Sequence, residues 1–150
     1  MNTRSILPLC LLLATCCMAQ QDASEVRKKA EATSGVDCVH LFLQSGRISL
    51  EEADRRFAAS DSKAAHLALD AAMRDMEHAV DCSLPVHRSQ KSLEIELREL
   101  SRRTLAIEKS TESEERPYLK SVQVEIERQR DRLLHAMFGD AAGSSTEKKH

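Results

Sequence analysis

The stretch that decides the fold is Lys91–Lys109, with the sequence KSLEIELRELSRRTLAIEK. Apolar and small residues recur in it at alternating spacings of four and three, and charged residues fill most positions between them. Because residues three and four apart are neighbours on a helical surface, this period predicts an amphipathic α-helix with one apolar seam. The seam residues are Leu93, Leu97, Leu100, Thr104 and Ile107.

A second copy of this pattern lies 29 residues further along the chain, where KSLEIEL at 91–97 is echoed by KSVQVEI at 120–126. Thr111–Glu114 is a turn and capping signal between the copies, and Pro117 is tolerated only in the first turn of a helix. We therefore predict an antiparallel helical hairpin over residues 86–138 that turns near 112, with pseudo-twofold packing. Its second seam is Val122, Ile126, Gln129, Leu133 and Ala136, with polar Gln129 in the place of Leu100.

Residues 22–82 carry the signals of another hairpin. We expect one helical stretch over 22–46, bent at Ser34–Gly35 and ended by Gly46. A capping box at Ser49–Glu52 predicts a new or kinked helix to about residue 59. Ser60–Asp61 is the turn and N-cap signal for a third helix over 62–81. The face of that third helix is Ala65, Leu69, Ala72, Met76 and Ala79.

Residues 50–80 resemble a single tetratricopeptide helix-turn-helix unit, through Ala53, Phe57, Ala65, Leu69 and Ala72. The resemblance implies two antiparallel helices that touch closely through small residues. Ser60 stands where that family has glycine, and no second copy follows at the family's repeat of about 34 residues. We therefore carry over the geometry of the unit and not the peptide-binding function of the family.

The first 19 residues look like an export signal. A basic start precedes a short apolar run, and the small residues of Cys17–Ala19 favour cleavage after Ala19. The alternatives are a bacterial lipoprotein, lipidated at Cys16 within Leu13–Cys16, and a retained anchor. The apolar run is shorter than the roughly 20 residues of a spanning helix, so we expect no membrane span.

The remaining chain is expected to form one extracytoplasmic helical domain, residues 20–138, with a disordered tail over 139–150. The whole sequence has 22 basic and 24 acidic residues, and the leader removes one arginine, which leaves 21 and 24 and a net charge of −3. This near balance argues against nucleic acid as a partner. The fold class predicted is all-α: two antiparallel helical hairpins in a small bundle.

Cleavage leaves two cysteines, Cys38 and Cys82, each 22 residues from Ser60. Two helical arms folded at that turn bring them to the same height, and an exported chain can keep a disulfide. We therefore predict a Cys38–Cys82 bridge. The alternative use of this region is a metal site, whose candidate ligands beside the cysteines are Asp37, His40, His78 and Asp81.

No glycine-rich phosphate loop or paired zinc spacing occurs, and a thin helical core leaves little room for a substrate cleft. We expect neither an enzyme nor a bound cofactor. The leading hypothesis is an exported interaction, scaffold or chaperone-like protein with a protein partner or self-association. The alternative is extracytoplasmic metal or stress sensing. Ile95, Leu105 and Val124 lie off the seams, so they either join the two hairpins or form the interaction surface.

Overall fold

The structure is a computed structural model that describes the backbone of residues 22–143 and the side chains of residues 22–139. The predicted leader and residues 144–150 of the predicted tail lie outside that range. Within it every regular element is helical, as the sequence predicts. The elements are α1 (Ala23–Glu31), α2 (Gly35–Ala58), α3 (Ser62–Ser83), the short 3₁₀ helix η1 (His87–Ser89), α4 (Gln90–Ser110) and α5 (Arg116–Gly143).

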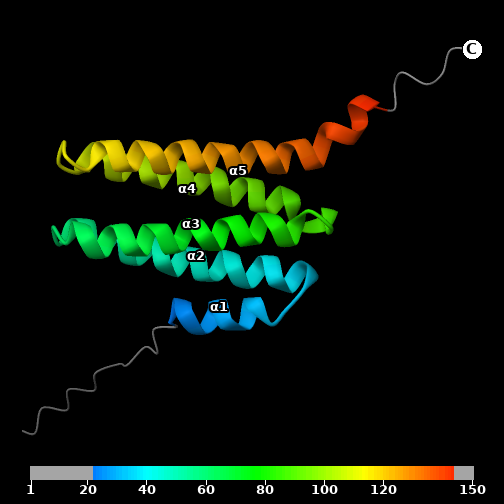
Figure 1. The fold of residues 1–150 in the computed structure, drawn as a ribbon, viewed down its shortest axis with the longest axis horizontal. Coiled ribbons are helices and arrows are strands. Elements are labelled where there is room, and N and C mark those ends of the chain that lie inside the picture. The colour runs from blue at the N-terminus through cyan, green and yellow to red at the C-terminus, as the bar shows by residue number, and fades with distance from the viewer. Residues whose placement is uncertain (1–21, 144–150) are drawn as a thin grey trace, which may run out of the picture.

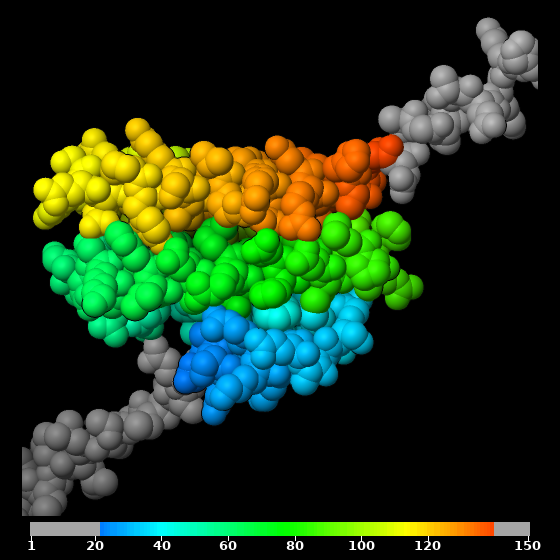
Figure 2. Space-filling model, in the orientation of Figure 1, coloured from blue at the N-terminus to red at the C-terminus, as the bar shows by residue number. Residues whose placement is uncertain are grey.

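The helices lie in three layers (Figure 1). Helices α2 and α3 run antiparallel as the middle layer, and α4 and α5 run antiparallel as a second layer on one side of it. Helix α1 packs on α2, on the opposite side of the middle layer. The two short turns, residues 59–61 and 111–115, lie at one end of the molecule, and the space-filling view shows side chains closing the layers against one another (Figure 2).

The predicted seams are buried between the layers, except at Ala136, which is half-buried. Aliphatic side chains form the core, and fully buried alanines at 53, 65, 72 and 79 accompany them in α2 and α3. Burial of each large side chain contributes about 1.5–3 kcal/mol, so these aliphatic residues are a main source of the stability of this fold. The large apolar residues that are fully buried are Val39, Leu69, Met76, Val80, Leu93, Leu97, Leu100, Leu119, Ile126 and Leu133.

The predicted bend at Ser34–Gly35 is a complete break, so α1 is a separate helix of nine residues. Gly35 begins α2 with φ +69°, a conformation that only glycine adopts readily. The predicted stop at Gly46 and restart at Ser49 are wrong, because α2 continues through both residues. Gly46 is buried against α3, where a Cβ atom would lie 2.6 Å from Met76 Cε. It is a point of close helix approach rather than a helix end.

The turns follow their sequence signals. Ser60 has φ 56°, and the Asp61 side chain caps α3 by accepting from the Ala64 backbone N–H at 3.3 Å. Pro117 is the second residue of α5, as predicted. The expected end of the hairpin at residue 138 is wrong, because α5 extends to Gly143 and takes in the first residues of the predicted disordered tail.

Candidate interaction surface

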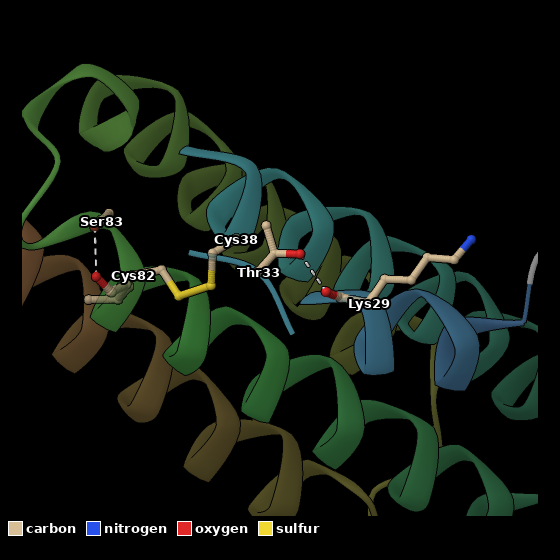
Figure 3. The surroundings of a disulfide bond; sticks show 6 residues. Lys29, Thr33, Cys38, Cys82 and Ser83 are labelled. Carbon is tan, nitrogen blue, oxygen red and sulfur yellow. Dashed lines mark hydrogen bonds between the residues drawn. A yellow bond between two sulfur atoms is a disulfide. The ribbon is translucent and has the colours of Figure 1, made fainter. Parts of the chain in front are cut away.

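The predicted disulfide joins Cys38, in the second turn of α2, to Cys82, at the end of α3. The two Cα atoms are 6.1 Å apart, within the range that a disulfide spans without backbone movement. Figure 3 shows the bridge beside the α1–α2 turn, where the Thr33 hydroxyl donates to the Lys29 carbonyl at 2.6 Å. The bridge therefore closes the first hairpin at the end opposite its turn.

The residues proposed as metal ligands serve other contacts or point to solvent. The His78 ring stacks on Phe42 with centroids 5.0 Å apart, and Asp81 accepts from Arg132 of α5 at 2.7 Å. Asp37 and His40 are exposed on α2. Among the residues described, no three His, Cys, Asp or Glu side chains come together as a metal-binding group.

An ion pair that the sequence patterns do not reveal holds α1 in place. The fully buried Asp75 carboxylate of α3 accepts from Arg27 Nε at 2.6 Å and from Arg27 Nη2 at 2.8 Å. The Ser45 hydroxyl of α2 donates to the same carboxylate at 2.7 Å and lies 3.0 Å from the Ala23 carbonyl oxygen. The hydrogen bond to Asp75 raises the pKa of Arg27, so the guanidinium remains charged. This cluster therefore ties all three helices of the first half together.

A second polar cluster joins the two hairpins at their turns. His66 of α3 stacks on Tyr118 of α5, with centroids 3.8 Å apart, and its Nε2 is hydrogen-bonded to Glu115. The Tyr118 hydroxyl donates to Asp70 at 2.8 Å. Burial and the Asp70 carboxylate both raise the pKa of Tyr118, which keeps the phenol protonated. These groups satisfy one another, so their chemistry is that of a structural clamp.

Beside this clamp lies a cleft of about 420 Å³. Partial burial raises the pKa of Asp54 in its wall, whereas hydrogen bonds from Ser62 and then His66 lower the pKa of Glu115. The cleft presents carboxylates and hydroxyls. Its walls include Asp54, Phe57, Ser62, Ile107, Thr111 and Glu115.

Polar contacts fix the register of α4 against α5. The Gln123 side chain donates to the Ser101 carbonyl at 2.8 Å, and Arg130 donates to the buried Glu94 at 3.1 Å. Bonds from Arg98 and Arg130 lower the pKa of Glu94. The seam residue Gln129 is fully buried and donates to the Glu125 carboxylate at 2.6 Å, so the polar position is satisfied.

The three residues proposed as an interaction surface do not join the two hairpins. Ile95 is 52% exposed, Leu105 42% and Val124 71%, and Phe138 on the same helix as Val124 is 61% exposed. They lie on the α4–α5 hairpin, whose other side packs on α2 and α3. Figure 2 shows α5 at the edge of the molecule, with no helix of residues 22–143 beyond it. We call this side of α4 and α5 the outer face.

None of the helices described in the structure combines the length and the apolar character that crossing a bilayer requires. No family model matches the sequence. No curated protein is significantly similar to it. No solved structure is significantly similar to it either.

Proposed function

We propose that this chain is an exported, non-catalytic interaction protein of scaffold or chaperone-like type, and that it presents the outer face of α4 and α5 to another protein. One observation carries the proposal: Ile95, Leu105 and Val124 remain in solvent although the sequence could have used them to join the hairpins. Exposed apolar residues gathered on one uncovered side of a helical pair are typical of a surface that a partner covers.

The asymmetry between the two hairpins supports the same reading. The first hairpin has its outer side covered in part by α1, which adds buried Val26 and Ala30 to the core. The second hairpin has no such helix among the residues described. A partner that covers Ile95 and Val124 would take the place that α1 takes on the first hairpin.

Export is part of the proposal. The predicted leader and the Cys38–Cys82 bridge are both features of chains that mature in an oxidising compartment. The predicted product is residues 20–150, and intact mass of exported material tests that boundary. A mass that corresponds to a lipidated Cys16 would replace simple cleavage with the lipoprotein alternative.

The surface is tested by chemical crosslinking of the exported protein in a cell-envelope preparation. The variant carries Ile95→Ser and Val124→Ser, and the matched control is Leu67→Ser, which alters a side chain 64% exposed on α3. We expect the control to keep the crosslinks of the wild type and the double variant to lose them, with circular dichroism and the urea midpoint unchanged. Full retention of the crosslinks by the double variant would refute the proposed surface. Loss of the fold would show that the two side chains belong to the core.

A further inference from the structure

The outer face carries a second stripe on each helix, parallel to the buried seams. On each helix the stripe follows the spacing four-three-four-three-four. It comprises positions 91, 95, 98, 102, 105 and 109 of α4 and positions 120, 124, 127, 131, 134 and 138 of α5. These two sets are related by the same 29-residue offset as the seams. All of these residues are exposed except Leu134, which is half-buried. The stripes are Lys91, Ile95, Arg98, Arg102, Leu105 and Lys109 on α4, and Lys120, Val124, Glu127, Asp131, Leu134 and Phe138 on α5.

The contacts between α4 and α5 place both stripes on the same side of the hairpin. Ser101 and Gln123 mark where the two helices face each other, and each stripe lies next to these contacts, on the side of its helix away from the seam. On α5 the opposite flank is occupied by α3, through Tyr118 and Arg132. The stripes therefore line the outer face together.

The charges of the two stripes are complementary. The charged residues of the α4 stripe are all cations, with Arg98 and Arg102 at its middle. The α5 stripe has two acids at its middle, Glu127 and Asp131, and one cation, Lys120, at its start. Apolar residues flank the charges on both stripes: Ile95 and Leu105 on α4 correspond to Val124 and Leu134 on α5. Helical stripes with apolar positions and charges of opposite sign are the pattern by which coiled-coil helices select their partners.

We propose that the partner of the outer face is a second copy of this chain, an inference that rests on the proposed function. The two copies are related by a two-fold axis that runs parallel to the helices. This axis places α4 of each copy against α5 of the other, and the two helices run antiparallel. The register of the hairpin brings Ser101 level with Gln123 and Glu94 level with Arg130. The two-fold therefore sets Lys91 within one helical turn of Asp131 of the second copy. That contact is made twice.

The size of the face suits a reversible dimer. Helix α4 has 21 residues, which gives a length of about 31 Å, and two helices packed side by side are about 20 Å wide. The face is thus roughly 600 Å² per copy, or about 1,200 Å² in total, at the lower end of specific protein interfaces. We expect a dimer whose population changes with protein concentration.

Lys91 and Asp131 provide the sharpest test, because both are exposed and neither takes part in the ion pairs of the described residues. The single variants Lys91→Glu and Asp131→Lys each place like charges at both copies of the contact. Exposed ion pairs are individually weak, but each variant reverses the charge at both copies of the contact, so we expect it to weaken self-association about tenfold. When the two variants are mixed, both contacts again have opposite charges, so dimers should form between them. The matched control is Lys63→Glu, which alters an exposed lysine at the start of α3.

The measurement is sedimentation of the mature chain over a series of concentrations, with crosslinked envelopes analysed in parallel. Rescue of dimers in the mixture of single variants supports the two-fold arrangement. A dimer that neither charge variant weakens lies on another face and overturns this inference. A chain that stays monomeric at every concentration also overturns it. In that case, envelope crosslinks that depend on Ile95 and Val124 would leave the proposed function standing with a different protein as partner.

Discussion

In the buried ion pair between Arg27 and Asp75, we expect the loss of one partner to destabilise the protein more than the loss of the other. We expect Arg27→Met to lower the free energy of unfolding more than Asp75→Asn does. The reason is burial: the Asp75 side chain is fully buried, whereas the Arg27 side chain keeps a quarter of its surface in solvent. An arginine without its partner can therefore reach water, and a buried carboxylate without its partner cannot.

The magnitudes follow from the contacts. Removal of one partner of a buried ion pair costs about 3–5 kcal/mol. We place Asp75→Asn near the lower limit, at about 3 kcal/mol, because Arg27 is rehydrated and the Ser45 hydroxyl can turn to the Ala23 carbonyl oxygen 3.0 Å away. Arg27→Met belongs near the upper limit, at about 5 kcal/mol, because only Ser45 remains to donate to the carboxylate.

Urea unfolding at neutral pH measures both costs, and hydrogen exchange of the α1 amides measures the local effect. Helix α1 buries only Val26 and Ala30, so its amides should lose protection before those of α3 do. The control is Arg47→Met, which breaks the exposed pair with Glu96 and should cost less than about 1 kcal/mol. Equal losses of unfolding free energy for Arg27→Met and Asp75→Asn would refute the argument from burial, and so would losses as small as that of Arg47→Met.

Three further predictions follow from other parts of the structure. Reduction of the Cys38–Cys82 bridge, 44 residues apart, should lower the free energy of unfolding by about 4 kcal/mol on the chain-entropy model, as measured by urea unfolding with and without a reductant. The pKa of Glu94 is lowered below its ordinary 4.5 in the folded state, so its contribution to stability is fully present above 4.5 and is lost as the pH falls below that value through the lowered pKa. Glu94→Gln should therefore make stability less dependent on pH in acid, as measured by urea midpoints at neutral pH and at about pH 3. Gly46→Val should lower the free energy of unfolding by more than about 2 kcal/mol. Gly46→Ala should change it by no more than about 1 kcal/mol, because the gain in helix propensity offsets a shift of the flexible Met76 terminus. Equal thermal midpoints for the two variants would contradict the close approach of α2 and α3.

The features that the sequence predicts well depend on neighbours along the chain. The seam period of α4 and the N-cap at Asp61 are local patterns, and the structure has both. The bridge from Cys38 to Cys82 follows from one turn and the fixed rise of a helix. In each case a few adjacent residues and the geometry of a single hairpin determine the result.

The features that the sequence does not predict depend on contacts between distant helices. Gly46 and Ser49 look like a helix end and a new cap, yet both are buried where α2 packs on its neighbours. Tertiary packing overrides local propensity at such positions. The sequence does indicate that Asp75 is buried, since it lies between Ala72 and Ala79 on the apolar side of α3. No pattern of neighbouring residues, however, identifies Arg27 as its partner.

The position of the disulfide has a mechanical consequence. A pulling force applied between the start of α1 and the end of α5 passes from Cys38 directly to Cys82, so the 43 residues between them carry no tension. Without the bridge, that segment could add up to about 150 Å of extended chain. With it, most of α2 and α3 stays folded while the rest of the protein is stretched. The middle layer is thus shielded from an end-to-end pull, and the α4–α5 hairpin keeps a folded support on which to pack.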